Sequence, residues 1–503
     1  MPGPARGTDR RSILHMPHRE RADEATLRRR FEEAGQEQVL RPLASLAGER
    51  RESYLAALDD VDLQLVRRLA DLARGKHSGN NRGKNSASPA SAADHPSLEP
   101  PETFPLERDS RQLAQAAEAS ERGRELLREG RVGYVLVAGG QASRLGFDGP
   151  KGLFPVGPVS GRVLFEFHAR RLARARAVHG APVRWYVMTS AANDAETRRA
   201  FALNEYYGLS PDDVVFFTQA MIPALGPEGE MLLARDGGLF LAPNGHGGSL
   251  QALARAGLLD DARERGIEHL SYFQVDNPLA RPADPLFLGL HALARAEMSS
   301  KVVAKRDAQE KVGVLGLVDG RLGCIEYSDL PDELRDARDS AGRLRFDAGN
   351  IAVHVIDRAF VERLTEGGLR LPWHVARKRM QVLDEAGRPT EVEGTKFETF
   401  VFDALGETTA SVTLEVDRAQ EFSPVKNATG SDSPATARAD LCRLFAGWAE
   451  GAGRRVPEPH PEHGHPLVEV DPLLAEDAEE FREAAPREPR TLGGGHLWTE
   501  QPS

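Results

Sequence analysis

Between residues 133 and 277, short apolar segments of β type alternate with longer helical ones. The β-type segments are 133–140, 183–190, 214–219 and 269–278, and the helical ones are 164–180, 193–209 and 249–266. Strands that alternate with helices of this length predict a parallel α/β sheet. In such sheets ligands bind beyond the carboxyl ends of the strands. Gly139-Gly140 and Val275-Asp276-Asn277 both fall at such ends.

The rest of the chain predicts further domains, since 503 residues are too many for one simple core. We expect a disordered leader (1–23), a helical N-terminal region (24–106) with a disordered insertion (75–105), a main domain (107–426), and a small C-terminal domain with a tail (427–503). The patterned sequence begins just after Met16, which leaves Met1 or Met16 open as the start. From about residue 300 the alternation loosens and strand-like segments become more frequent, at 301–305, 312–318, 323–329, 350–356 and 410–416.

Charge and cysteine content exclude several classes of protein. A net charge of -11 argues against a nucleic-acid partner, which needs a basic face. The two cysteines, Cys324 and Cys442, suggest neither a disulfide framework nor a zinc cluster, which fits the cytoplasm. No apolar run approaches the roughly 20 residues that span a bilayer, and the Arg-rich N-terminus has no apolar signal core, so no membrane partner is expected.

The strongest chemical signal is the glycine-rich segment 135–157. A strand leads into Gly139-Gly140, and Arg144 and Lys151 follow in a loop with three more glycines. Glycines let backbone N–H groups approach phosphates, and the two cations suit a departing pyrophosphate. The segment lacks both GxGxxG and GxxxxGK[ST], which disfavours a Rossmann dinucleotide site and a Walker P-loop. On spacing alone, an ordinary glycine-rich surface turn remains open.

A histidine-containing segment near the C-terminus gives a weaker signal. The stretch 457–466 contains His460, His463 and His465 among prolines. We found no partner cluster at ligand spacing, so this stretch predicts a turn or linker rather than a metal site.

Several segments resemble one family. GGQ-x-x-RLG followed by PKG (139–152) resembles the eukaryotic UDP-N-acetylhexosamine pyrophosphorylases of the UTP–sugar-1-phosphate uridylyltransferase family (UDPGP type 1). Further segments look like family segments and follow in family order, at 34–37, 98–101, 188–190, 216–225, 243–248, 272–289, 312–314, 326–330, 346–354, 394–403, 421–428 and 468–481. The resemblance implies a Rossmann-like nucleotidyltransferase domain of GT-A-like type, with a mixed sheet and helices on both faces, over 107–426.

The resemblance also implies a nucleotide site. The residues that would contact the nucleotide are Ala138, Gly139, Gly140, Gln219, Gly245, His246 and Asp276. Gln219 would read the uracil edge, because an amide offers both a donor and an acceptor. Asp276 would bind Mg²⁺, a hard cation that prefers oxygen ligands. From the local sequence alone, without the family resemblance, Gln219 is interpreted as an ordinary strand residue and Asp276 as a helix N-cap or turn residue. His246 departs from the usual Gly-Asn-Gly-Gly pattern, and Ala142-Ser143 replaces the more familiar Gly-Thr, which puts base specificity in doubt.

The implied sugar site and the remaining cations complete the set. The residues that would bind the sugar are Gly313, Glu326, Tyr327 and Asn350, with Gly313 leaving space for an N-acetyl group. The residues that would neutralise phosphate in catalysis are Arg144, Lys151, Lys396 and Lys426. On local sequence alone, Glu326 is interpreted as a solvated residue at the edge of a strand, and each lysine as an ordinary surface residue. In the implied reaction an oxygen of the sugar phosphate attacks the α-phosphorus of UTP, and positioning and charge neutralisation do the catalysis.

These observations predict a magnesium-dependent uridylyltransferase acting on UTP and a sugar 1-phosphate, most consistent with N-acetylglucosamine 1-phosphate. A glucose 1-phosphate or broad UDP-sugar pyrophosphorylase is the alternative within the class. From another class, an inactive sugar-nucleotide-binding regulatory protein is disfavoured by the retained cations. A glycosyltransferase would favour an Asp-x-Asp motif, which VDNP does not fit. The sequence leaves open whether the protein is a monomer or a homodimer.

Overall fold

The computed structural model describes residues 21–75, 97–384 and 386–499. They fold into two compact units. The smaller unit contains the N-terminal helices with residues 221–242 and 374–397. The larger unit contains residues 97–220, 243–373 and 398–499.

A ten-stranded mixed sheet forms the centre of the larger unit. Its order is β1-β9-β11-β7-β2-β3-β4, with β10 beside β9, β8 beside β11 and β14 beside β8. The strands are β1 (Leu98–Glu99), β2 (Val132–Val137), β3 (Trp185–Thr189), β4 (Val214–Thr218), β7 (His269–Gln274), β8 (Met298–Ala304), β9 (Val314–Val318), β10 (Arg321–Ile325), β11 (Ala348–Asp357) and β14 (Thr413–Glu415). β7, β2, β3 and β4 run parallel, whereas β11 is antiparallel to β7, β8 and β9. The predicted mixed α/β sheet is confirmed, and its parallel part is the region of regular alternation.

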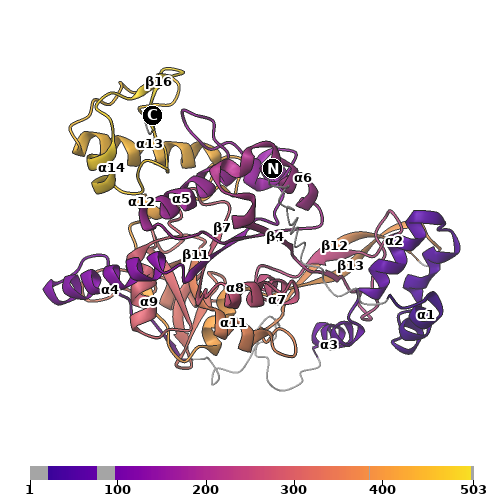
Figure 1. The fold of residues 1–503 in the computed structure, drawn as a ribbon. Coiled ribbons are helices and arrows are strands. Elements are labelled where there is room, and N and C mark those ends of the chain that lie inside the picture. The colour runs from indigo at the N-terminus through magenta and orange to yellow at the C-terminus, as the bar shows by residue number, and fades with distance from the viewer. Residues whose placement is uncertain (1–20, 76–96, 385, 500–503) are drawn as a thin grey trace, which may run out of the picture. The chain divides into compact units, whose positions relative to one another are not determined.

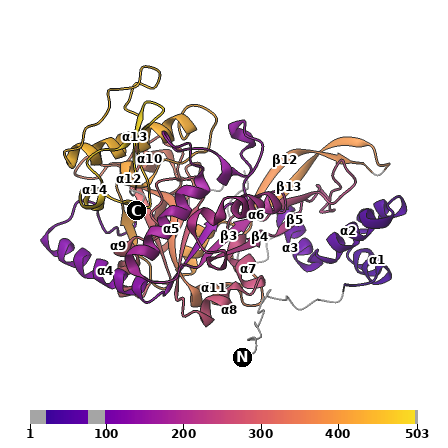
Figure 2. The same cartoon turned by 45° about the horizontal axis from the view of Figure 1, so that its top comes forward.

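Helices cover both faces of this sheet, as Figures 1 and 2 show. Along β2, Tyr134 and Leu136 join the core on the face of α5, and Val135 joins the core on the face of α7. The helices are α4 (Ser110–Arg128), α5 (Leu164–His179), α6 (Asp194–Leu203), α7 (Gly248–Arg255), α8 (Leu258–Glu264), α9 (Pro285–Leu293), α10 (Asp332–Arg335), α11 (Arg358–Thr365), α12 (Arg418–Glu421), α13 (Pro434–Gly451) and α14 (Ala478–Ala484). Because both faces are buried, the central strands carry continuous apolar runs instead of alternating polar ones.

Residues after 427 begin with α13 and then form a small sheet of their own. Its strands are β15 (Val468–Val470), β16 (Arg490–Leu492) and β17 (Gly495–Trp498). β17 is parallel to β15 and antiparallel to β16. Trp498 and Phe481 are fully buried against each other, with ring centroids 5.5 Å apart. This apolar contact anchors α14 on the small sheet.

Two helices differ from the sequence expectation, and the backbone shows why. The helix expected over 249–266 is two helices, α7 and α8, because Gly257 between them adopts a left-handed φ of 68°. The helix expected over 193–209 ends at Leu203, and Glu205, Tyr206 and Tyr207 all have positive φ. The leader is outside the described residues up to residue 20, and so are residues 76–96 of the expected insertion. In the described part of that insertion, β1 pairs with β9.

The smaller unit combines helices with two hairpin-like sheets. Its elements are α1 (Glu24–Glu33), the 3₁₀ helix η1 (Glu37–Ala44), α2 (Gly48–Asp59), α3 (Leu63–Ala73), β5 (Met221–Pro223), β6 (Leu241–Pro243), β12 (His374–Leu383) and β13 (Pro389–Glu398). The amide of Gln36 donates from Nε2 to the carbonyl of Gly229 (3.1 Å) and accepts at Oε1 from the N–H of Met231 (2.7 Å). The motif at 34–37 therefore has a structural role, since it ties the N-terminal helices to the loop between β5 and β6.

Across the described part of the chain, no helix has both the length and the apolar character needed to cross a membrane.

Candidate active site

The loop after β2 closes on itself through backbone hydrogen bonds. The N–H of Ala142 donates to the carbonyl of Gly149, and the N–H of Lys151 donates to the carbonyl of Gly140, both at 3.0 Å. Gly146 and Gly149 have φ values of 71° and 146°, which L side chains rarely adopt. The glycines therefore let the chain turn back and bring Lys151 beside the start of the loop.

Asn193, which the sequence analysis missed, fixes the start of this loop. Its Nδ2 donates to the carbonyls of Ala138 (2.9 Å) and Gly140 (3.3 Å), and the residue is 1% exposed. Its Oδ1 accepts from the N–H of Ser190 at 2.8 Å, so the amide orientation is set from both ends. The only sequence signal is an Asn at the start of α6, which reads as an ordinary helix cap.

Asp276 lies beyond the end of β7, where it pairs with Lys151 and feels the charge of Lys426. Nζ of Lys151 is 3.1 Å from its Oδ2, and the backbone N–H of Val425 donates to its carbonyl at 2.9 Å. Burial alone would raise the pKa of Asp276, but the charges of Lys151 and Lys426 outweigh it and hold this pKa below its usual range. The fold thus brings together three predicted residues from three distant segments.

The other predicted cations are arranged differently. Arg144 is exposed and makes no hydrogen bond or ion pair with any residue that the structure describes. Lys426 is also exposed, and its Nζ lies 5.5 Å from the centroid of the Phe422 ring. Lys396 belongs to the smaller unit, where its Nζ lies 5.4 Å from the centroid of the Phe240 ring. The roles of these three residues stay predictions.

The residues predicted to contact the uracil lie together. Gln219 follows β4, is 7% exposed, and donates from Nε2 to the carbonyl of Gly245 at 2.8 Å. A Cβ on Gly139 would lie 3.0 Å from Oε1 of Gln219, whereas a Cβ on Gly140 would meet no atom within 4 Å. Packing explains the glycine at 139. The glycine at 140 has no such packing reason, which fits a backbone kept bare for a ligand.

His246 is held by its own neighbours. Its Nδ1 accepts from the N–H of Val401 at 3.2 Å, and its ring stacks on Phe400 with centroids 5.2 Å apart. Its carbonyl accepts from the hydroxyl of Ser249 at 2.6 Å. The preceding Gly245 cannot carry a side chain, because a Cβ there would lie 2.3 Å from the carbonyl oxygen of Thr399. Close approach of the segment 399–401 therefore accounts for this part of the glycine-rich motif.

Three of the four predicted sugar residues converge. The N–H of Asn350 donates to the carbonyl of Gly313 at 2.8 Å, and a Cβ on Gly313 would lie 3.7 Å from Oε1 of Glu326. Cys324, which the sequence analysis treated only as a redox marker, lies among them. Its Sγ accepts from Nδ2 of Asn350 at 3.8 Å and would be 2.8 Å from a Cβ on Gly313. Burial raises the pKa of this thiol, so it stays protonated. Tyr327, by contrast, is 44% exposed.

The sheet places the sugar set and Asp276 at one edge. In the β7–β11 ladder, His354 pairs with Tyr272. β11 runs antiparallel to β7, so its first residues, which include Asn350, extend past the end of β7 toward Asp276. The edge beyond the carboxyl ends of the parallel strands therefore carries the predicted residues, as expected for this architecture.

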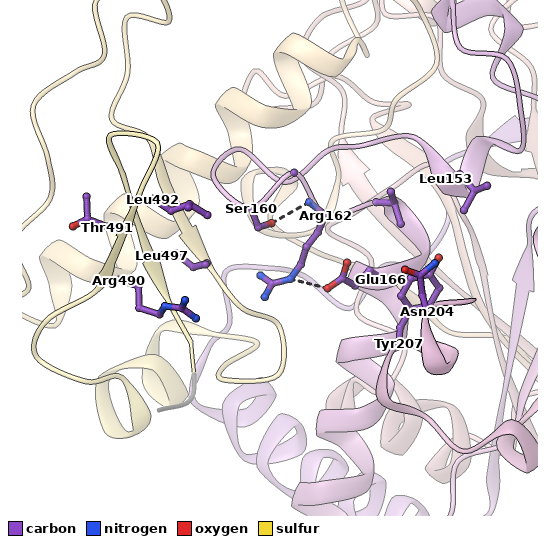
Figure 3. A pocket seen from close by; sticks show the side chains of 12 residues that line it. Leu153, Ser160, Arg162, Glu166, Asn204, Tyr207, Arg490, Thr491, Leu492 and Leu497 are labelled. Carbon is purple, nitrogen blue, oxygen red and sulfur yellow. Dashed lines mark hydrogen bonds and ion pairs between the residues drawn. The ribbon is translucent and has the colours of Figure 1, made fainter. Parts of the chain in front are cut away.

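A cavity of about 440 Å³ lies elsewhere in the larger unit, against the C-terminal strands. Figure 3 shows its lining, in which Arg162 points to Glu166. Beside it Arg162 also pairs with Glu469 (3.0 Å) and Asp471 (2.9 Å). None of the predicted nucleotide or sugar residues lines this cavity. The shallower arrangement around Asp276, rather than the cavity, therefore has the chemistry expected of the active site.

Comparison with known proteins points to one family. Residues 88–461 match the model of UTP–glucose-1-phosphate uridylyltransferase. UDP-N-acetylhexosamine pyrophosphorylase-like protein 1 of Xenopus tropicalis is 36% identical over 462 residues, which cover 89% of this chain and 88% of that protein. The UDP-N-acetylglucosamine pyrophosphorylase of Saccharomyces cerevisiae is 36% identical over 347 residues, which cover 66% of this chain and 73% of that protein.

Solved structures agree. The crystal structure of the uridine diphosphate N-acetylglucosamine pyrophosphorylase from Trypanosoma brucei, in complex with an inhibitor, is 27% identical and has a TM-score of 0.76. The match covers 93% of this chain and 95% of that one.

Proposed function

Because the chain belongs to the UTP–glucose-1-phosphate uridylyltransferase family, we propose that it joins UTP to N-acetylglucosamine 1-phosphate, forming UDP-N-acetylglucosamine and pyrophosphate. One observation carries the proposal. Asp276, just beyond the end of β7, pairs with Lys151 of the closed glycine-rich loop and is also influenced by the charge of Lys426. A carboxylate influenced by two cations suits a site that receives a metal ion and two polyanions at once.

In the proposed reaction an oxygen of the sugar phosphate forms a bond to the α-phosphorus of UTP. The bond from that phosphorus to the bridging oxygen breaks, and pyrophosphate leaves with the electron pair. The nucleophile is already an anion near pH 7, so no side chain needs to remove a proton. The main barrier is the repulsion between two polyanions, which Arg144, Lys151 and Lys426 would offset. Gln219 and Gly139 would orient the uridine.

Proteins of this family generally use a divalent metal. We assign Mg²⁺ to Asp276, whose single buried carboxylate fits the ion because Mg²⁺ is often held by one or two carboxylates plus phosphate oxygens and water. When bound, the ion would supply positive charge to the phosphates. Lys151, which pairs with Asp276 at 3.1 Å, would add a positive charge for the phosphates of the departing pyrophosphate.

The sugar preference rests on the set around Gly313. A Cβ on Gly313 would press on Sγ of Cys324 and lie 3.7 Å from Oε1 of Glu326, so the glycine keeps side-chain bulk away from Glu326, where an N-acetyl group would lie. Asn350 offers an amide for hydroxyls or the acetyl oxygen. A glucose 1-phosphate enzyme is the second candidate, favoured by the description of the matching family model. The two substrates differ at one substituent, so the preference is testable at Gly313.

The test is a panel of sugar 1-phosphates crossed with the four nucleoside triphosphates, read by pyrophosphate release. We expect the highest kcat/KM for UTP with N-acetylglucosamine 1-phosphate, and loss of activity in EDTA that Mg²⁺ restores. A higher kcat/KM with glucose 1-phosphate would select the second candidate. If no pair released pyrophosphate while UDP-sugar still bound in calorimetry, the protein would be a sugar-nucleotide-binding regulator instead.

We also propose the cytoplasm as the site of action. Cys324 and Cys442 are both free thiols in the structure. Free, partly or fully buried cysteines are compatible with a reducing compartment. Fractionation of the producing cells would check this.

A further inference from the structure

Two histidines and an aspartate meet at the edge of the sheet opposite Asp276. His269 is the first residue of β7 and pairs directly across the ladder with Asp357, the last residue of β11. His291 on α9 packs its ring against His269, with centroids 5.1 Å apart. One ligand atom from each of the three residues lies within 4.8 Å of the other two.

Two of the nitrogens are buried and have no hydrogen-bond partner among the residues that the structure describes. Nε2 of His291 is unpaired, and that residue is 0% exposed. Nδ1 of His269 lies 2.9 Å from Oδ1 of Asp357, yet the geometry is not that of a hydrogen bond. A buried polar atom without a partner costs about 1–3 kcal/mol. Two buried imidazole nitrogens without a hydrogen bond, in a cluster that also contains a carboxylate, fit a site for a bound cation.

A neighbouring side chain orients His291. Its Nδ1 lies 2.8 Å from Oγ of Ser299 on β8. The same oxygen also accepts from the N–H of Val412 at 3.3 Å. In the tautomer in which Nδ1–H donates to this hydroxyl, Nε2 has a lone pair that is free for a metal ion. Metal-binding histidines commonly have their second nitrogen fixed by such a partner.

From this geometry we propose that His269, His291 and Asp357 bind a divalent transition-metal ion of the Zn²⁺ class. Imidazole nitrogens favour such ions, whereas Mg²⁺ prefers an all-oxygen set. The side chain of Asp357 is 36% exposed, so the ion has a route to solvent, and water would complete its coordination. Nothing in this proposal depends on the uridylyltransferase reaction.

The site is structural and separate from the active site. β7 separates the two sites, since it runs from His269 to Gln274, which corresponds to about 17 Å at about 3.3 Å per residue, and Asp276 lies two residues beyond its end. Bound metal would tie α9 to β7 and β11 at the far edge of the sheet. Because binding favours the folded state, the ion should raise the melting temperature without changing the reaction.

A second, exposed group must be removed before the test. His460, Glu462 and His463 also offer ligand atoms within 4.8 Å of one another, a cluster that the sequence analysis did not find because Glu462 completes it. The experiment therefore uses full-length protein carrying His460→Ala and His463→Ala, stripped with a chelator and then dialysed into Mg²⁺. Zn²⁺ is titrated by calorimetry, and Co²⁺ is titrated by visible absorption.

We expect one equivalent of Zn²⁺ to bind and to raise the melting temperature. Asp357→Asn should weaken binding at least about tenfold, and Ser299→Ala should weaken it by about 10–100-fold. Asp357 makes no side-chain cap to α11, so the Asn variant should fold normally. The proposal is overturned if the parent binds no equivalent, or if a folded Asp357→Asn protein binds Zn²⁺ as tightly as the parent. Co²⁺ spectra without imidazole-type tetrahedral or five-coordinate bands would also overturn it.

Discussion

Two groups of charged residues in the larger unit differ in how their charges are satisfied. Near the C-terminal sheet, Arg162 and Arg170 pair with Glu469 and Asp471, whose side chains are 0% and 1% exposed. By contrast, Arg144 and Lys426, which are predicted to neutralise phosphate, make no ion pair within the described residues. In the first group the arginine and carboxylate charges neutralise each other, and the ion pairs hold the segment around α5 to the segment around β15. The second group presents two exposed cations that are unpaired among the described residues, in a protein whose net charge is -11.

The difference shows how a structural charge cluster can be distinguished from a binding one. Buried charges that pair with each other stabilise the folded protein, and removing one partner lowers its free energy of unfolding. Exposed cations without partners cost little to remove in the unbound protein, but a polyanion bound to them loses its neutralising charge. Each of the following substitutions should therefore affect stability or turnover, and rarely both.

The largest effect is expected at Glu469. Its Oε2 accepts from the N–H groups of Val159 and Ser160, and its Oε1 accepts from Arg162. Glu469→Gln should lower the free energy of unfolding by about 3–5 kcal/mol, because Arg162 loses one of its two buried carboxylate partners and the amide cannot accept hydrogen bonds at both of its former oxygen positions. Urea unfolding measures this, with the exposed Glu483→Gln on α14 as control. Equal stability of the two variants would show that the cluster does not hold the C-terminal region.

Arg144→Ala should have the opposite profile. We expect kcat to fall by about 10²–10³, since the charge on departing pyrophosphate grows as the bond breaks. The melting temperature should stay within a degree or so, because the side chain has no partner to lose. Arg199→Ala on α6, also exposed, is the matched control. A folded Arg144→Ala enzyme with normal kcat would remove this residue from the site.

Lys151 should combine the two behaviours. Lys151→Ala removes a phosphate contact and also leaves buried Asp276 with one fewer positive neighbour, so both kcat and stability should fall. Lys151→Arg should rescue poorly, because a planar fork does not replace a compact ammonium. A Lys151→Arg enzyme with wild-type kcat would show that only charge matters at this position.

Local pattern predicts much of this arrangement, and contacts between distant segments supply the rest. The alternation from 133 to 277 predicts the parallel strands and the end of the sheet at which Asp276 lies, because strand and helix patterns depend on residues close together in the sequence. No local signal pairs Asp276 with Lys426, which are 150 residues apart, or brings Asn193 onto the carbonyl of Ala138. The break at Gly257 could have been anticipated from the glycine, whereas the left-handed Tyr206 and Tyr207 could not.

A smaller effect is expected from bulk in the sugar set. Gly313→Val should shift the ratio of kcat/KM values toward glucose 1-phosphate by about 10–200-fold, because the added methyl groups would fill space beside Glu326. A Cβ at 313 also presses on Sγ of Cys324, so the variant is compared in a Cys324→Ala background. Gly323→Val is the control, since a Cβ there meets no atom within 4 Å. An unchanged ratio in a folded protein would place the N-acetyl group elsewhere.

The smallest effect should come from His246. The family resemblance predicts this residue in the nucleotide site, and the structure shows it bonded to its own neighbours. Its Nδ1 accepts from Val401, and its ring stacks on Phe400. In His246→Asn the amide Oδ1 lies close to the position of Nδ1 and can accept the same hydrogen bond. We therefore expect kcat/KM for UTP to change by less than about threefold, with the loss of stacking costing about 0.5–1.5 kcal/mol of stability.

His246→Ala separates the two possible roles of this residue. It leaves the N–H of Val401 without an acceptor, which costs about 1–3 kcal/mol if the group stays buried. If His246 only braces the segment 399–401, the Ala variant should lose stability while the preference for UTP over CTP stays constant. If His246 also contacts the base, both variants should change that preference. The residue would then act in binding, as predicted for Arg144 and Lys426, and not only in stability, as expected for Glu469. Steady-state kinetics with both nucleotides, together with thermal unfolding, measures the two quantities on the same proteins.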